Sequence, residues 1–280
     1  MAAKRTYLDD TGKYANWSRM VRVYAPREPG EKQRVSDPLM LLGISGATGT
    51  VDEWKRIGIA WQEILGSFGL TVFHAADFDA RAKSFRGLSN GQRDDLITKL
   101  VSAIAGIQPL VALLRPELYA YSYDDPGHSG DLDEEREHDP CFWFCLSRAA
   151  LQAGGGETEI VFARTPKYVG RPMFLHRCFV EHHGSGSHLE RDLSVVAAKD
   201  ILQLQVADLI VWGFNRLIGR NPDPKEEPEA FDRYAWWVER FSNVVLPSDD
   251  CRLLSREEAE QTYVEIADLC FCRRRKESVR

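Results

Sequence analysis

The stretch ILQLQVADLIVWGFNRLI, residues 201–218, has the composition of a helix that is buried on most of its sides. Twelve of its eighteen residues are apolar, so a helix over residues 200–219 would be enclosed around most of its circumference. Strands and helices predicted elsewhere in the chain would supply the layers that enclose it.

Apolar strands and amphipathic helices alternate along the rest of the chain. We expect strands at residues 6–9, 38–44, 70–73, 110–114, 159–163 and 174–180, and helices at 50–67, 89–104, 141–153, 200–219, 229–243 and 255–271. This alternation is typical of the α/β class. The Pro- and charge-rich stretch NPDPKEEPE, residues 221–229, predicts a boundary between an α/β domain over 1–222 and a helical C-terminal extension over 223–280.

Composition restricts the class of protein. The 280 residues carry a formal net charge of −6 and are 44% hydrophobic, which allows a sizeable core. Residues 121–140 hold eight Asp and Glu against one Arg, and a solvated loop is the simplest interpretation. Neither a secretory signal nor an apolar membrane span is evident, so we expect a cytoplasmic protein with no membrane partner. The six cysteines lack CxxC spacing, which favours reduced thiols.

Asp208 is the strongest anomaly, because it lies in the middle of the apolar helix with Gln205 on the same face. An uncompensated carboxylate there would cost several kcal/mol. It could be compensated by capping another segment, by pairing with an arginine, or by binding a cation. The last of these supplies a function, and we favour it.

A second polar cluster follows a short apolar run. FHAADFDAR, residues 73–81, places His74, Asp77, Asp79 and Arg81 where a strand is expected to end. Ligands of open α/β sheets bind at that edge. A solvated loop that caps the next helix is the alternative.

Two adjacent aspartates end the first predicted strand, in RTYLDDTG at residues 5–12. Successive strand residues point to opposite faces, so Asp9 and Asp10 cannot both bind one ion from a regular strand. One would be a ligand, and the other would form the turn or accept a hydrogen bond, unless the strand curls.

Two further patterns are weaker. GISGATGTVDEW places Gly43, Gly46 and Gly49 between a strand and a helix, as in a dinucleotide-binding turn, but no lysine follows and acids occupy the first helical turn. We expect a flexible strand-to-helix turn there. EHHGSGSH, residues 181–188, has adjacent histidines that would point apart on a strand, so a polar loop is favoured over a zinc site.

Three motifs together resemble the bacterial family called domain of unknown function 3800. They are YLDDTG at 7–12, FHAADF at 73–78 followed by SFRGLSNGQRDDLITKLVSAI, and LQVADLIVW at 204–212. That family typically opens with Tyr-Ile-Asp-Glu-Ser-Gly, carries a His-centred motif after a middle strand and closes with Gln-x-x-Asp in a helix. The resemblance covers roughly residues 5–220.

The resemblance implies an RNase H-like fold and nuclease activity. It matches Asp9 to the family's opening Asp, Asp10 to its Glu, Asp77 to the acid of the middle motif, and Gln205 and Asp208 to the closing pair. Asp10 is one methylene shorter than the Glu that it replaces, which shortens its reach to a metal.

In an RNase H-like sheet the first strand is central, a middle strand lies beside it and a late helix packs across the edge, so Asp9, Asp77 and Asp208 would meet. Crowded carboxylates repel one another unless cations neutralise them. We expect Asp9, Asp10, Asp77 and Asp208 to hold Mg²⁺ or Mn²⁺. Two such ions about 4 Å apart would serve phosphodiester cleavage. Gln205 could position a ligand or the phosphate, and His74 could carry a proton to the leaving group.

The sequence therefore predicts an α/β protein with an RNase H-like mixed sheet flanked by helices, and a metal-dependent nuclease acting on DNA or RNA. Bacterial defence or mobile-element biology is the setting that the resemblance implies. The alternatives are a non-catalytic binding or scaffold protein of the same fold, and a Rossmann-type oxidoreductase centred on Gly43–Gly49. The C-terminal helices could mediate dimerisation or contact a partner protein.

Overall fold

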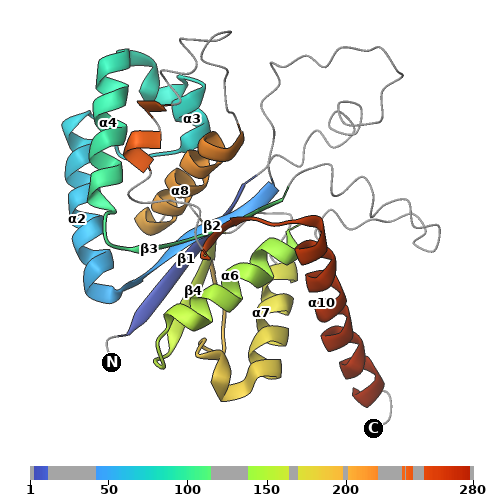
Figure 1. Ribbon diagram of the computed structural model, residues 1–280. Helices are drawn as coiled ribbons and strands as arrows, with labels where there is room; N and C mark the ends of the chain where they lie inside the picture. Colours follow the sequence, from blue (N-terminus) through green and yellow to red (C-terminus); the bar gives the residue numbers. More distant parts are fainter. Residues whose placement is uncertain are drawn as a thin grey trace, which may run out of the picture.

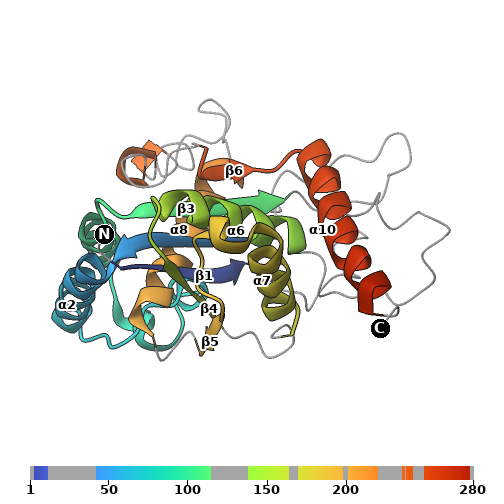
Figure 2. The same cartoon turned by 90° about the horizontal axis from the view of Figure 1, so that it is seen from below.

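A mixed sheet of six strands forms the centre of the molecule. The computed structural model describes residues 3–11, 42–114, 138–163, 170–197, 201–219, 235–236, 238–241 and 249–277. Its strands are β1 (Lys4–Thr11), β2 (Leu42–Thr50), β3 (Gln108–Leu114), β4 (Thr158–Ala163), β5 (Ser194–Val196) and β6 (Cys251–Leu253), arranged in the order β5-β4-β1-β2-β3-β6. β1, β2 and β3 pair antiparallel, whereas β4 runs parallel to β1, β5 to β4 and β6 to β3 (Figure 2).

Helices cover both faces of this sheet (Figure 1). One face carries α2 (Val51–Ser67), α3 (Ala75–Asp79), α4 (Asn90–Ala103) and α8 (Leu202–Gly219), and the other carries α6 (Asp139–Gln152), α7 (Gly170–His183) and α10 (Arg256–Glu277). Two short 3₁₀ helices, η2 (Lys83–Gly87) and η4 (Gly184–Ser187), lie in the connections between these elements. The α/β class predicted from the alternation of elements is confirmed.

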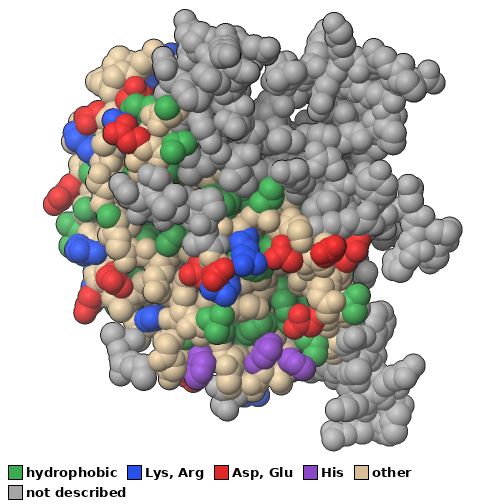
Figure 3. Space-filling model, in the orientation of Figure 1, with side chains coloured by type: hydrophobic (Ala, Val, Ile, Leu, Met, Phe, Trp, Pro, Cys, Tyr) green, Lys and Arg blue, Asp and Glu red, His purple; other side chains and the backbone are tan. Residues whose placement is uncertain are grey.

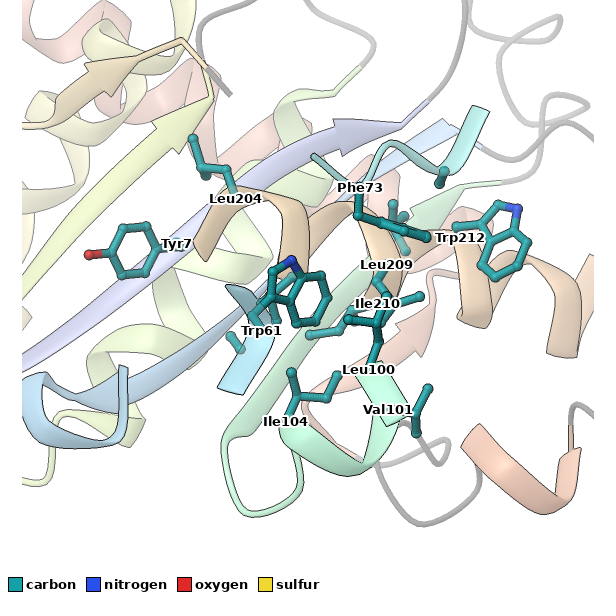
Figure 4. Packing of buried hydrophobic residues seen from close by; sticks show 14 of the residues in the cluster. Tyr7, Trp61, Phe73, Leu100, Val101, Ile104, Leu204, Leu209, Ile210 and Trp212 are labelled. Carbon is teal, nitrogen blue, oxygen red and sulfur yellow. The ribbon is translucent and has the colours of Figure 1, made fainter. Parts of the chain in front are cut away.

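The strands divide their side chains between two hydrophobic cores. Tyr7, Val111 and Val161 face the α8 side, whereas their neighbours Leu8 and Ile160 face α6 and α7. This is the alternation that the pleat of a strand requires. On the α8 side, Leu204, Leu209 and Ile210 pack among Trp61, Leu100 and Ile104 (Figure 4). The apolar composition of residues 201–218 reflects this burial.

Two predicted helix starts are confirmed in detail. Thr50 and Glu53 form a reciprocal capping box at the start of α2, and Ser89 and Gln92 form another at the start of α4. The buried stripe of α2, formed by Trp54, Ile57, Trp61 and Leu65, follows the 3.6-residue period of an amphipathic helix.

Three local predictions were wrong. Residues 70–73 include a bend and join no strand. Residues 174–180 belong to helix α7, whose buried Leu175, Cys178 and Phe179 follow helical spacing, so the adjacent histidines at 182 and 183 end a helix and not a strand. The glycines from Gly43 to Gly49 lie within β2 and do not form a turn before α2.

The glycines of β2 are required by close approach of the neighbouring strands. A Cβ atom on Gly46 would lie 1.8 Å from the carbonyl oxygen of Tyr7 in β1, and one on Gly43 would lie 2.2 Å from the carbonyl oxygen of Ala112 in β3. Because both obstacles are backbone atoms, no side-chain rotation can relieve the overlap.

The described C-terminal residues pack against the same sheet. β6 pairs with β3, and the Phe241 ring packs against Gly213 of α8. Ala259 and Ile266 of α10 are buried in the core that α6 and α7 share. Residues 13–37, the acidic segment up to residue 137, the boundary at 222/223 and most of the predicted helix 229–243 lie outside the described residues. Among the helices that are described, none combines the length and apolarity needed to cross a membrane.

Gly46→Ala should destabilise the fold, because its new methyl group meets the backbone of Tyr7. We expect the free energy of unfolding, measured by urea denaturation, to fall by about 1–3 kcal/mol or more. Gly66→Ala is the matched control, since a Cβ atom at Gly66 meets no atom within 4 Å and alanine favours a helix. Equal stability of the two variants would contradict the close approach of β1 and β2.

Candidate functional site

The candidate site lies where β1 ends beneath α8. Asp9 follows Tyr7 by two residues and so shares the face that α8 covers, while Asp10 starts from the opposite face. β1 stays paired with β2 as far as Thr11, which places Asp9 directly across from Ser45. The sequence prediction that the two aspartates leave the strand on opposite sides agrees with this register.

A buried serine fixes α8 over this end of the sheet. Ser45 is fully buried in β2, and its Oγ atom donates a hydrogen bond of 2.9 Å to the carbonyl oxygen of Ala207. Ala207 immediately precedes Asp208, so this bond holds the helix where the Asp208 and Asp9 carboxylates act on each other electrostatically. The sequence offered no sign of this role, because Ser45 was placed in a predicted turn.

Gln205 is fully engaged within the core. Its side-chain oxygen accepts hydrogen bonds from the Trp61 indole at 3.2 Å and from the Phe73 backbone N–H at 2.9 Å. The Gln205 side chain is buried. Gln205 therefore joins α2, α8 and the segment before α3, and its oxygen is not directed at the carboxylates.

Asp208 holds the same segment two residues further along. Its Oδ2 atom accepts a hydrogen bond of 2.7 Å from the backbone N–H of Ala75, the first residue of α3. One of the alternatives considered for a buried Asp208, capping of another segment, is thus present. Burial raises the pKa of Asp208, although the Ala75 N–H and His74 oppose this, and the charges of Asp10 and Asp77 add to it.

Asp9 is the most strongly perturbed carboxyl group of the site. Burial, followed by the charges of Asp10 and Asp208, raises the pKa of Asp9 well above its ordinary value. The Asp10 backbone N–H, 2.9 Å from Asp9 Oδ1, opposes this, while a hydrogen bond between the two carboxyl groups adds to it. Asp10 thus reaches its neighbour although the two leave the strand on opposite faces.

Asp77 lies beside this pair of carboxylates and contacts Lys83 and His74. Its Oδ2 atom lies 2.7 Å from Lys83 Nζ and 3.3 Å from His74 Nδ1. The hydrogen bond from Lys83, with a smaller contribution from His74, lowers the pKa of Asp77. Asp77 is close enough to Asp208 to affect its titration, and Lys83 is a member of the site that sequence reasoning missed.

The remaining candidates lie apart from these carboxylates. Arg81 donates to the Asn90 side chain at 2.7 Å. At the end of the acidic segment, Asp139 is buried and pairs with Arg171 at the start of α7. Histidine side chains gather at the lower edge of the face in Figure 3. Helix α7 ends with His182 and His183.

No ready-made metal cage is present in the described part of the chain, where no three His, Cys, Asp or Glu side chains are grouped to hold an ion. Asp9 and Asp208 remain a pair of interacting carboxylates to which the described residues bring no Lys or Arg. Such a pair could hold one cation between them, with the Oδ1 atom of Asp208 unused by Ala75.

Replacing Gln205 by methionine, which has a similar shape, should leave the Trp61 and Phe73 donors buried without an acceptor. We expect the free energy of unfolding to fall by about 1–3 kcal/mol per donor, and hydrogen exchange at the Phe73 amide to accelerate. Gln203→Met on the same helix is the control, because the structure records no hydrogen bond of Gln203 with a described residue. Equal losses in both variants would refute the role given to Gln205.

The pKa shifts predict opposite pH dependences for two variants. The pKa of Asp9 is higher in the folded chain than in the unfolded chain, so ionisation of this carboxyl group favours unfolding. Asp9 therefore destabilises the folded chain increasingly as pH rises from about 4. Asp9→Asn should therefore be more stable than the wild type at pH 7, by about 1.4 kcal/mol per unit of pKa difference, with the gain vanishing in acid.

Asp77 has a lowered pKa, so it stabilises the folded chain above its ordinary pKa, and this stabilisation is lost as pH falls through the lowered value. Asp77→Asn should therefore be less stable than the wild type at pH 7 and equal to it in acid. Urea denaturation of both variants from pH 3 to 8 checks the two signs. Parallel pH profiles would show that the two aspartates do not differ as described.

Comparison with known proteins identifies no relative of this chain. No protein-family model matches the chain, and neither the curated proteins nor the solved structures contain a significant match. The interpretation of the site therefore rests on its own residues.

Proposed function

We propose that the chain is a metal-dependent hydrolase of nucleic-acid phosphodiesters, with its centre at Asp9 and Asp208. The observation that carries this proposal is the meeting of two half-buried carboxylates from β1 and α8, with no Lys or Arg of the described chain between them. Desolvated like charges are unfavourable unless a cation joins them, and active sites commonly contain such arrangements.

The topology supports an RNase H-like assignment for the sheet. β1 lies in the interior of the strand order, β4 runs parallel beside it, and α8 packs on β1 and β2. The central first strand is what the resemblance to the domain of unknown function 3800 family implies, whereas the strand expected before Asp77 is not formed and α8 packs on the face of β1 and β2. The residues of its three motifs lie together in space: Asp9 in β1, His74 and Asp77 at α3, and Asp208 in α8.

The donor set fits a hard divalent cation. Mg²⁺ and Mn²⁺ prefer oxygen ligands, and Mg²⁺ is usually bound through one or two carboxylates together with water and substrate phosphate. Asp9 and Asp208 meet that requirement without a third protein ligand, and Asp10 adds negative charge beside them. When bound, one or two such ions would activate water and stabilise the charge on the leaving oxygen.

His74 is suited to move a proton beside this pair. Its Nδ1 atom faces Asp77, which would fix the orientation of the ring, and its side chain is 56% exposed, so Nε2 can reach a substrate. Asp77 then orients His74, and its hydrogen bond from Lys83 makes it less suited to metal binding. Gln205 supports the segment that carries His74 and needs no contact with substrate.

A non-catalytic binding module is the second candidate, and one observation favours it. Gln205 and Asp208 both serve to hold residues 73–75, so the polar residues of α8 already have a structural use. The Rossmann-type alternative loses its basis, because Gly43–Gly49 lie in β2, where backbone atoms of β3 and β1 close off Gly43 and Gly46.

Cleavage of labelled single- and double-stranded DNA and RNA in Mn²⁺ or Mg²⁺ tests the proposal. Asp208→Asn keeps an acceptor for Ala75 but removes the charge, so we expect cleavage to fall to the level of buffer alone, as it should in EDTA. Asp52→Asn, at an exposed position of α2, is the control and should cleave as the wild type does. Activity that persists in Asp208→Asn would place the chemistry elsewhere, and inactivity of the wild type on all substrates would favour the binding module.

A further inference from the structure

A positively charged segment borders the carboxylates. Residues 80–93 contain four Lys and Arg and no Asp or Glu. We define the cationic rim as Arg81, Lys83 and Arg86, whose side chains are all exposed. Arg86 makes no ion pair with any residue that the structure describes, and the pair between Lys83 and Asp77 is an exposed one of the kind that exchanges partners readily.

One buried aromatic residue, Phe85, attaches the rim to the hydrophobic core. Phe85 lies between Lys83 and Arg86 and is buried, with its ring centroid 5.5 Å from that of Phe78 and 6.1 Å from that of Phe73. The backbone N–H of Phe73 is in turn held by Gln205. The cations are therefore attached to the same framework that positions Asp208.

The backbone of the rim adopts a conformation that side chains usually avoid. Arg81 and Lys83 have φ angles of 50° and 49°, and the only other described residue besides glycine with a positive φ is His188. Glycine would take this conformation without strain. Strain of this kind concentrates at sites that bind ligands, and here it occurs at Lys83, which pairs with Asp77, and at Arg81, which donates to Asn90.

The rim is connected to the carboxylates by a short series of contacts. Lys83 contacts Asp77, Asp77 contacts His74, and the next residue, Ala75, donates to Asp208. Asp9 and Asp208 attract cations but repel a phosphate. A polyanion could approach them only if fixed positive charge beside them offsets that repulsion.

We propose that the cationic rim is the binding site for the phosphate backbone of a nucleic acid, which it holds next to Asp9 and Asp208. This inference rests on the proposed function, because it names the surface through which that site would meet its substrate. Lys83 exchanges Asp77 for a phosphate oxygen when the strand binds, and Arg86 contacts a neighbouring phosphate. Such contacts are independent of base sequence and sensitive to salt.

Fluorescence anisotropy with a fluorescein-labelled 20-nucleotide DNA, single-stranded and duplex, tests this in EDTA, where no cleavage occurs. The variant is Lys83→Gln/Arg86→Gln. The control is Lys55→Gln/Arg56→Gln, which removes the same charges from the start of α2, at the end of the sheet remote from Asp9. We expect the first variant to bind about 10-fold more weakly in about 0.1 M salt and to reduce the slope of log K against log salt by about 2, with the control unchanged.

Two results would overturn the inference: absence of binding by the wild type, or equal binding by the two double variants. The metal-dependent cleavage assay judges the proposed function separately. Loss of binding in Lys83→Gln/Arg86→Gln together with an inactive wild type would support the phosphate-binding role of the rim and reject the hydrolase activity. An active wild type whose DNA binding is unaltered in this double variant would support the hydrolase activity and reject the role of the rim.

Discussion

The arrangement of this molecule depends on the burial of two polar side chains in one apolar helix. Gln205 and Asp208 lie on the inner side of α8, where unpaired polar groups would be costly. Each accepts a hydrogen bond from a backbone N–H of the segment that leads into α3, Gln205 from Phe73 and Asp208 from Ala75. That segment belongs to no sheet, so the helix supplies the acceptors that a neighbouring strand would otherwise provide.

This interaction also brings the charged groups together. Holding residues 73–75 against α8 places His74 and Asp77 beside Asp208, while Ser45 anchors α8 over the end of β1, where Asp9 lies. The resulting pair of half-buried acids has raised pKa values and therefore opposes folding at neutral pH. Clusters of like charges that lower the stability of the folded state are typical of functional sites, where binding of a ligand offsets the loss.

Sequence reasoning was most successful where a periodic pattern or a capping pair determines local structure. The helix starts at Thr50 and Ser89 and the burial of α8 were predictable for that reason. It failed for α7, where an apolar run of strand length belongs to a helix, and for β2, where glycines that suggest a turn instead permit close packing of strands. Such cases are decided by partners distant in sequence, which a local pattern does not contain.

The site was predictable in its members more than in their roles. A carboxylate in an apolar helix and an aspartate at a strand end pointed to Asp208 and Asp9, and the structure brings their charges together. The actual partners of Gln205 and the use of Ser45 depend on tertiary contacts between residues up to 162 positions apart. Sequence spacing carries no information about contacts of that kind.

The central claim is that Asp9 and Asp208 form a binding site for a divalent cation. Anomalous diffraction from crystals soaked in Mn²⁺ tests it most directly, because it locates the ion without relying on activity. We predict an anomalous peak within coordination distance of both carboxylates, lost in Asp208→Asn. A map without a peak there, or a peak that persists in the variant, would contradict the claim and leave Asp208 with its structural bond to Ala75 alone.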